Sequence, residues 1–439
     1  MPGALLAAAR RVTITPPVGV DLTGFGARSG PSAGVHDDLR ACALYLTDTA
    51  RELLIITCDL IGLHHEEVAQ VRAGISERAG IAPESVMICC SHTHSGPATR
   101  CLNYLGKQDE GYLSELQRRL VGLAAWAKSE AVPAGLGSTR APLRVGVNRR
   151  EWRDGAIVLG INETGPTAPH VDLLCVDDAE GRPLCRLFCH AAHAVTLGGD
   201  NLLLSGDWPG FAQREVERCY GPGCVAMFVQ GCCGDINSHV GAGFEAAQAE
   251  GKRLATAVLT ADPEAPRRDA VPLAAATIGL ELPLTDVPSV PEARKLVADA
   301  RRHAQSSAEQ DNYGLRTLNE GMVHWARQLL ALAEDGATGR TVPFEVQALR
   351  IGDLGIVGLP GEVFVDYALK IDADGHLPCT AVAAYTNGNI GYVPTAKAFA
   401  EGGYEVHSAI RFYGTTMQTP HSEELILQAA DEVLAKVAI

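Results

Sequence analysis

Short apolar runs alternate along the chain with amphipathic segments, and this alternation predicts the fold. Runs rich in β-branched residues predict strands, which we expect at 11–15, 41–47, 52–60, 85–90, 171–177, 183–189 and 224–230. Apolar residues spaced for one face of a helix predict helices over 65–80 and 110–131. Strands that alternate with helices are typical of α/β proteins. We therefore expect a large mixed β-sheet core with flanking helices.

Residues 287–338 differ from the rest of the chain. They are rich in charge, nearly free of turn signals and helical in period, as in "SVPEARKLVADARRHAQ" and "LRTLNEGMVHWARQLLALAED". This pattern predicts a helical hairpin inserted between two strands. No internal repeat, low-complexity tract or long linker interrupts the sequence. The simplest organisation is one α/β domain over residues 1–439 that carries this helical insertion.

Composition narrows the classes of partner and the compartment. The net charge of −15 argues against nucleic acid and anionic membrane surfaces. No apolar run approaches the roughly 20 residues of a membrane-spanning helix, so no stable membrane insertion is expected. The 13 cysteines include no C-x-x-C pair, and the first residues do not resemble a secretory signal. Free thiols in a reducing, cytoplasmic compartment are the expectation.

Polar residues collect where four predicted strands end. The stretch "SHTHSGP" (91–97) carries His92 and His94, and "FCHAAHAVTLGGDN" (188–201) carries His190 and His193. Two further loops complete the set, namely "GLPGEVF" with Glu362 and "NGNIGYVPT" with Tyr392. In α/β proteins, sites gather in loops beyond strand ends. Two histidines, a carboxylate and one more oxygen make a plausible zinc site.

Each of these residues also has a structural interpretation. Glu362 suits the N-terminus of a helix, where a carboxylate is favoured. One of His190 and His193 suits a buried core position, and Asp207 and Asp235 suit either turns and caps or the support of histidine ligands. The adjacent pair Cys232 and Cys233 offers a thiolate nucleophile as an alternative to the metal.

Five motifs share the order and rough spacing of one enzyme family, as follows: "SHTHSGP", "HAVTLGGDN…SGDWPG", "FVQGCCGDIN", "GLPGEVF" and "GYVPTAKAFAEGGYE". With them the chain resembles the catalytic domain of the neutral/alkaline (non-lysosomal) ceramidases, from about residue 14 to residue 410. The resemblance implies a zinc ion held by His92, His193, Glu362 and Tyr392. His193 is chosen because "HAVTLGGDN" matches the family better than the frame that starts at His190.

The same resemblance implies catalytic roles for three other residues. His94 matches the family residue that supports the reacting centre, and Tyr404 matches a further tyrosine near the metal. Arg149, in "VGVNRRE", matches less closely an arginine that contacts the substrate carbonyl region.

Two departures from the family pattern bear on the substrate. The family's G-D-x-S-P-N element reads "GDINSH" here, which puts Asn237 at the serine position and Ser238 one residue later. Asn237 can donate a hydrogen bond but cannot act as a nucleophile. The tail domain of the family has no counterpart in the sequence, which indicates a branch with a stand-alone catalytic domain. We expect a smaller, polar, cytosolic amide substrate instead of ceramide.

The predicted function is therefore zinc-dependent hydrolysis of an amide (N-acyl) bond in a small or acylated substrate. Water activated by zinc would attack the carbonyl carbon. Arg149 or Tyr404 would stabilise the carbonyl oxygen, and His94 would carry the proton to the leaving amine. The alternatives are a zinc-dependent ester or lactone hydrolase and a catalytically silent metal-binding homologue.

Overall fold

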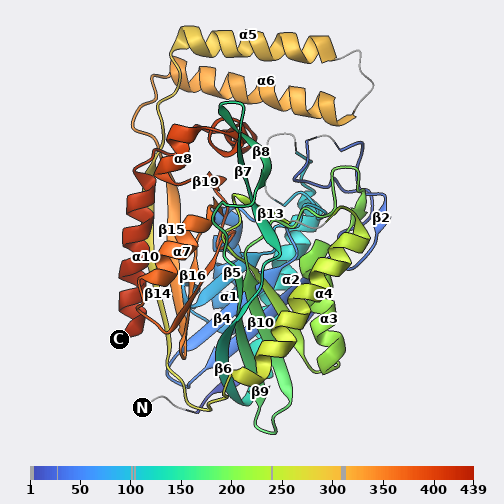
Figure 1. Ribbon diagram of the computed structural model, residues 1–439, viewed down its shortest axis with the longest axis vertical. Helices are drawn as coiled ribbons and strands as arrows, with labels where there is room; N and C mark the ends of the chain where they lie inside the picture. The colour runs from blue at the N-terminus through green and yellow to red at the C-terminus, as the bar shows by residue number, and fades with distance from the viewer. Residues whose placement is uncertain (1–3, 27, 100–101, 103–104, 239–240, 308–312) are drawn as a thin grey trace.

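An eight-stranded mixed sheet forms the centre of the protein (Figure 1). The computed structural model describes residues 4–26, 28–99, 102, 105–238, 241–307 and 313–439. The strands of this sheet, in spatial order, are β12 (Val225–Gln230), β10 (Pro183–His190), β9 (His170–Asp178), β6 (Val132–Pro142), β1 (Leu6–Thr13), β3 (Arg40–Thr47), β4 (Glu52–Cys58) and β5 (Val86–Cys90). The pairs β10–β12 and β4–β5 are parallel and the others antiparallel, so the predicted mixed sheet is confirmed.

A second, smaller sheet packs face to face on the first. Its strands, in spatial order, are β14 (Leu273–Pro283), β15 (Thr341–Ile351), β16 (Leu354–Gly358) and β18 (Cys379–Ala383). Side chains of alternate residues point to opposite faces of a strand. One set therefore fills the space between the two sheets, including Leu44, Ile55, Leu349 and Ile356. The other set, including Ala43 and Ile56, belongs to the core under the helices.

Helices cover the outer faces of both sheets. Those on the large sheet are α1 (His65–Ala79), α2 (Glu110–Ser129), α3 (Asp207–Tyr220) and α4 (Phe244–Ala261). Those on the small sheet are α7 (Val365–Ala373) and α10 (Ser422–Ala438). The result is a layered arrangement of helices, sheet, sheet and helices. None of the helices in the described part of the chain has both the length and the apolar character that crossing a bilayer requires.

The predicted helical hairpin is present between β14 and β15. It consists of α5 (Val290–Ser307) and α6 (Tyr313–Glu334), which pack against each other. In Figure 1 the pair lies at the top of the molecule, above the β7–β8 hairpin. The insertion thus covers one end of the layers, which is also the end that carries the predicted site.

Short ribbons and helices build that end of the molecule. They are β2 (Gly34–Val35) with β11 (Leu203–Leu204), β13 (Ile236–Ser238) with β7 (Gly146–Arg153) and β8 (Ala156–Asn162), and β17 (Glu362–Val363) with β19 (Tyr392–Val393). The short helices α8 (Ala396–Glu401), α9 (Tyr404–His407) and η3 (Ala409–Tyr413) belong to the same end. Two other short helices lie elsewhere: η1 (Pro83–Ser85) directly before β5 and η2 (Asp262–Glu264) directly after α4. These ribbons bring residues from both halves of the chain to one place.

Two sequence predictions need correction. The first strand was expected at 11–15, but β1 begins at Leu6 and ends at Thr13. Its alanines Ala7 and Ala9 carry no strong strand signal, yet their small side chains fit the tight space between the sheets. The helix expected near Glu362 begins later, at Val365, so Glu362 lies in the strand β17.

Candidate metal centre

His92 lies just beyond the end of β5, and its ring is fixed by the backbone. Its φ angle is +58°, a left-handed conformation that costs a non-glycine residue free energy and is found often at functional sites. The ring Nδ1–H donates to the carbonyl oxygen of Ile61 at 2.7 Å. This bond leaves the Nε2 lone pair free to bind a metal.

His193 reaches the same point from the loop after β10. Its Nδ1–H donates to the carbonyl oxygen of Cys233 at 2.6 Å, so its Nε2 is also free as an acceptor. His190 faces elsewhere, because its Nδ1–H donates to the His170 carbonyl oxygen at 2.7 Å and its Nε2 accepts from the Val145 N–H. Of the two candidate histidines in this loop, His193 is the one that lies beside His92.

Glu362 places a carboxylate between the two histidines. Its Oε2 lies 3.3 Å from His193 Nε2 and 3.5 Å from His92 Nε2. The other oxygen, Oε1, accepts a hydrogen bond from the Tyr413 hydroxyl. Burial opposes ionisation of this carboxyl, but the adjacent histidines, His92 foremost, hold its pKa well below the usual value. Glu362 is therefore an anionic group in a buried cluster of imidazoles.

Tyr392 is positioned by the pairing of β17 with β19. The two strands are parallel, and Glu362 stands opposite Tyr392 in their register. The Tyr392 hydroxyl accepts a hydrogen bond from Arg149 Nη2 at 2.9 Å. The four residues predicted to hold zinc thus lie in one buried neighbourhood, although they come from distant parts of the sequence.

The donor set and its spacing fit a small divalent cation. A tetrahedral zinc ion with bonds of about 2.0–2.1 Å has ligand atoms about 3.4 Å apart. The two nitrogen-to-oxygen distances around Glu362, 3.3 and 3.5 Å, match this edge length. The ring nitrogens of His92, His94 and His193 also lie within 4.8 Å of one another. Burial, followed by the Arg149 charge, lowers the pKa of His193 to about 4, which favours the neutral, metal-binding imidazole.

His94 lies beside this set, under the segment that carries Gly24 and Phe25. Its Nε2 is 3.2 Å from His92 Nε2, and the Phe25 ring meets its ring edge-on at 4.9 Å. A Cβ at Gly24, whose φ is +93°, would come within 2.4 Å of His94 Nδ1, so only glycine lets the loop pass this close. Burial, followed by the charges of His92 and His193, holds the pKa of His94 well below its usual value.

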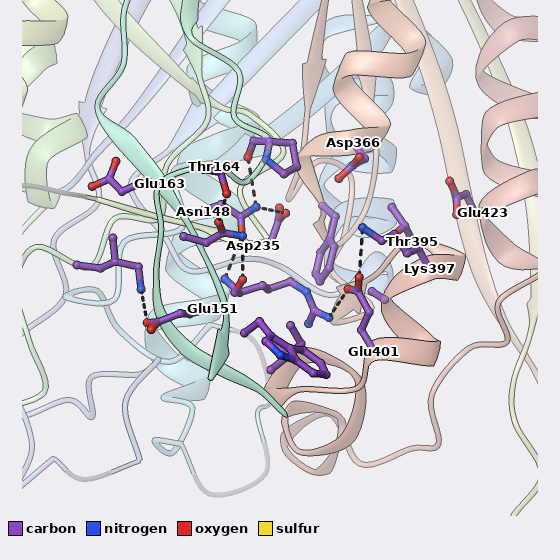
Figure 2. Close-up of a pocket in the computed structure, with 18 of the residues that line it drawn as sticks. Asn148, Glu151, Glu163, Thr164, Asp235, Asp366, Thr395, Lys397, Glu401 and Glu423 are labelled. Carbon is purple, nitrogen blue, oxygen red and sulfur yellow. Dashed lines mark hydrogen bonds and ion pairs between the residues drawn. The ribbon is translucent and has the colours of Figure 1, made fainter. Parts of the chain in front are cut away.

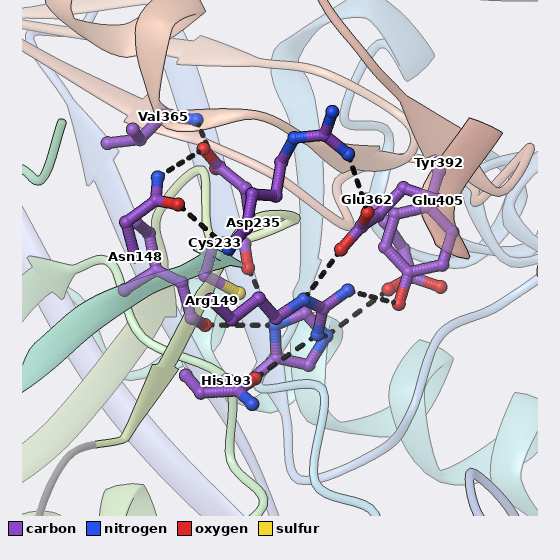
Figure 3. A network of polar contacts seen from close by, with 12 residues as sticks. Asn148, Arg149, His193, Cys233, Asp235, Glu362, Val365, Tyr392 and Glu405 are labelled. Carbon is purple, nitrogen blue, oxygen red and sulfur yellow. Dashed lines mark hydrogen bonds and ion pairs between the residues drawn. The ribbon is translucent and has the colours of Figure 1, made fainter. Parts of the chain in front are cut away.

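Arg149 connects the metal centre to a second buried group, as Figure 3 shows. Its Nη1 donates to Asn237 Oδ1 at 3.1 Å and lies 3.5 Å from His193 Nε2. Its Nε donates to Glu405 at 2.9 Å. Glu405 is 1% exposed and also accepts from Arg150 Nη1 at 2.8 Å, so one carboxylate holds two buried guanidinium groups.

Glu405 was not predicted from the sequence. It follows Tyr404, which was predicted as a catalytic residue and whose ring lies 5.8 Å from the Tyr392 ring. In the sequence, a charged residue directly after Tyr404 suggests an exposed position on the helix α9, and only the fold brings it to Arg149. The one signal in the sequence was the adjacent pair "RR" at 149–150, which would need an acidic partner if buried.

The support of the two histidines differs from the prediction. Asp207 and Asp235 were candidates for orienting them, but backbone carbonyl groups do so instead. Asp235 accepts from Asn148 Nδ2 and from the Val365 N–H at the start of α7, each at 2.8 Å. Asp235, and not Glu362, therefore caps that helix. Asp207 accepts from the N–H groups of Leu197 and Trp208, which is a local capping role.

Two other sequence-based alternatives can be compared with the geometry. Cys232 and Cys233 are fully buried, and burial raises the pKa of both thiols, which disfavours a thiolate nucleophile. Ser238 does not face the Arg149 side chain. It contacts the Thr196 hydroxyl at 3.1 Å, while Asn237, on the opposite face of β13, contacts Arg149.

A large cavity, lined in part by Arg150, lies near this arginine pair, and Figure 2 shows its lining. Its volume is about 1140 Å³, and it lies between the β7–β8 hairpin and the helices α7 and α8. Its carboxylates include Glu401, which contacts Arg150, and Glu423, which contacts Lys370. None of the eight predicted site residues lines this cavity. It is therefore separate from the metal centre.

Comparison with known proteins places this geometry in context. No family model matches the chain. A neutral ceramidase of Mycobacterium tuberculosis is 23% identical over 455 aligned residues, which cover 89% of this chain and 71% of the relative. The crystal structure of neutral ceramidase from Pseudomonas aeruginosa superposes with a TM-score of 0.74 at 20% identity, covering 99% of this chain and 74% of that one.

The chain has the neutral ceramidase fold. A second solved structure, a ceramidase complexed with C2, agrees with a TM-score of 0.75 at 19% identity, over 98% of this chain and 75% of its own. The resemblance to the neutral ceramidases that the sequence motifs indicate is thus confirmed. Within this fold, β19, which carries Tyr392, lies near the end of the layers that the α5–α6 hairpin covers (Figure 1).

Proposed function

We propose that this protein is a zinc-dependent hydrolase that cleaves an amide (N-acyl) bond in a small or acylated substrate. One observation carries the proposal: a buried glutamate lies within 3.5 Å of two histidine nitrogens whose rings are already oriented to bind a cation. His92, His193, Glu362 and Tyr392 would hold the ion. The similarity to proteins named ceramidases supports an amide as the bond that is cleaved.

A bound divalent ion would lower the pKa of a bound water to about 7 and polarise a carbonyl group. The protein's own residues would orient the substrate and move protons. Arg149 and Tyr404 would donate hydrogen bonds to the carbonyl oxygen, where charge develops during attack. Arg149 is held for this by Glu405, and its Nη2 lies 2.9 Å from the Tyr392 hydroxyl.

His94 would carry the proton to the leaving amine. Its pKa lies well below the usual value, so the ring is neutral and can accept a proton from water before it donates one. Asn237 would add a hydrogen bond to a substrate oxygen from the Arg149 side. No protein nucleophile is required, which is consistent with asparagine at the position of the family serine.

The remaining features of the proposal stay predictions. We propose that residues 1–439 form one catalytic domain, with α5 and α6 as an insertion into it. A substrate smaller and more polar than ceramide and a cytoplasmic location are parts of the same proposal. The buried metal centre, in which His92 and His193 are 2% and 1% exposed, suits a compact substrate group.

Metal analysis and a substrate screen test the proposal together. Protein purified without added metal is expected to contain about one zinc per chain, and to hydrolyse members of a panel of N-acyl amines. His92→Ala and Glu362→Gln are expected to lose both the zinc and the activity. His190→Gln is the matched control, because it alters a buried histidine of the same segment that does not face the cluster.

The outcomes separate the alternatives. Hydrolysis of esters or lactones without any amide cleavage would identify an ester or lactone hydrolase. Zinc binding without turnover of any acyl substrate would identify a silent metal-binding homologue. Zinc well below one equivalent, with no activity gained when it is added back, would contradict the proposal.

A further inference from the structure

Arg28 differs from every other buried arginine in the described part of the chain. Arg72, Arg149, Arg150 and Arg186 each contact a carboxylate within 3.0 Å. Arg28 is 4% exposed and contacts none among the residues that the structure describes. A buried cation that lacks an anionic partner is costly, and a bound anion would offset that cost.

The hydrogen bonds of Arg28 leave part of its guanidinium group free. Its Nη1 donates to the carbonyl oxygen of Asn201, and its Nη2 donates to those of His94 and Thr23. The Nε–H is buried and has no partner among the described residues. A guanidinium group has five N–H donors. Three backbone carbonyl groups therefore hold the group in place and leave donors for a ligand.

The cation is next to the reacting centre, on the His94 side. It donates directly to the His94 backbone. The Phe25 ring is near both side chains, with its centroid 5.3 Å from the guanidinium carbon and 4.9 Å from the centroid of the His94 ring. The nearest carboxylate that acts on it, Asp200, is exposed and influences it only through its charge. Burial dominates and lowers the pKa of Arg28 to about 10, which leaves it charged at neutral pH.

We propose that Arg28 binds a carboxylate on the amine half of the substrate, so that the protein acts preferentially on N-acyl amino acids. The inference rests on the proposed function, in which His94 delivers the proton to the leaving amine. The amine half must then lie beside His94, where Arg28 also lies. Guanidinium and carboxylate groups form short, strong, directional pairs. An anionic substrate would supply the partner that the folded chain does not provide.

A matched substrate pair measures this directly. N-Octanoylglycine carries the carboxylate, and N-octanoylglycinamide replaces it by a neutral amide of the same shape. Hydrogen bonds to charged groups are worth about 10- to 100-fold in affinity. We expect the zinc-loaded enzyme to prefer the carboxylate by this factor in kcat/KM. The same factor is expected between the dissociation constants of the two ligands with the metal-free Glu362→Gln variant, measured by calorimetry, because this variant keeps Arg28 and cannot turn the ligand over.

Two variants assign the preference to Arg28. Arg28→Gln removes the charge, and the ratio between the two substrates is expected to fall to near one. Asp200→Asn removes the exposed carboxylate that competes for Arg28, and its ratio is expected to rise above that of the unmodified protein. Because Asp200→Asn leaves the loop and its backbone contacts intact, it keeps the test valid if Arg28→Gln does not fold.

Each result decides the matter. A ratio of about one in the unmodified enzyme would overturn the inference while amide hydrolysis, and with it the proposed function, remained. A loss in Arg28→Gln that is equal for both ligands would show that Arg28 only holds the loop. If neither compound is hydrolysed, turnover of the wider N-acyl panel decides the proposed function, and the calorimetric ratio decides whether Arg28 binds the carboxylate.

Discussion

Glu405→Gln tests whether one carboxylate holds the buried arginine pair beside the metal centre. Glu405 contacts Arg149 at 2.9 Å and Arg150 at 2.8 Å, and its side chain is 1% exposed. The substitution keeps the size and removes the charge. Arg149 would then be a buried cation that retains only neutral partners, Tyr392 and Asn237. Arg150 would keep a weaker contact with Glu401, at 3.3 Å.

The structure sets the expected size of the effect. Removal of one partner from a buried ion pair costs about 3–5 kcal/mol, because the remaining charge is left without compensation. An unfolding entropy of about 2.1 cal/mol/K per residue gives about 0.9 kcal/mol/K for a chain of 439 residues. The expected fall in Tm is therefore about 3–5 °C. Scanning calorimetry of the metal-free proteins measures it without interference from metal loss.

Glu401→Gln is the matched control. Glu401 contacts only Arg150 of the pair, and its side chain is 30% exposed, so solvent screens the interaction and the cost should be below about 1 kcal/mol. The proposed role of Arg149 adds a second measurement, since Glu405→Gln should also lower kcat/KM. Equal changes in Tm for the two variants would refute the argument that Glu405 compensates both cations.

Three further predictions concern the metal and its surroundings. Removal of zinc by a chelator should lower Tm. A free zinc concentration of 100 times Kd should raise the unfolding free energy by about 2.7 kcal/mol over that of the metal-free protein. An unchanged Tm would count against zinc binding by the folded state. Tyr413→Phe removes the hydrogen bond to the outer oxygen of Glu362 and should weaken zinc binding about 10- to 100-fold, as measured by competition with a chromogenic chelator. Burial lowers the pKa of His190 to about 4, so the unfolded chain binds this proton first as the pH falls below about 6.5. The metal-free protein therefore loses stability on acidification. In urea titrations, His190→Gln should abolish about 2 kcal/mol of the loss in unfolding free energy between pH 7 and pH 5. A variant with the same pH dependence as the unmodified protein would contradict this.

The layers of the fold could be predicted because period and burial coincide in most elements. The helices α1 and α2 have clear amphipathic patterns, and strands such as β3 and β12 are continuous apolar runs. The hydrophobic periodicity of the sequence does not show how the two sheets pack against each other. The alanines of β1 are strand residues only because a second sheet lies over them, and the small β17–β19 ribbon is too short to leave a pattern.

The candidate metal site could be predicted only in part. Motif order links His92, His193, Glu362 and Tyr392, and the structure places Glu362 beside the two histidines and opposite Tyr392 in the β17–β19 pair. Their support was not predictable, since backbone carbonyl groups of Ile61 and Cys233 orient the rings and any residue type has a carbonyl. Glu405 and Arg28 were missed for a related reason. Their partners are far away in sequence, and no spacing rule links them.

The separation of the cluster along the chain has a consequence for how the protein is made. His92 leaves the ribosome some 270 residues before Glu362, which in turn precedes Tyr392 by a full helix and strand. The β17–β19 ribbon that sets the spacing of the last two residues can form only when nearly the whole polypeptide has been synthesised. In the proposed function, cation uptake would therefore be a late event in biogenesis, and a nascent chain stalled before residue 362 would expose two imidazoles with no carboxylate between them.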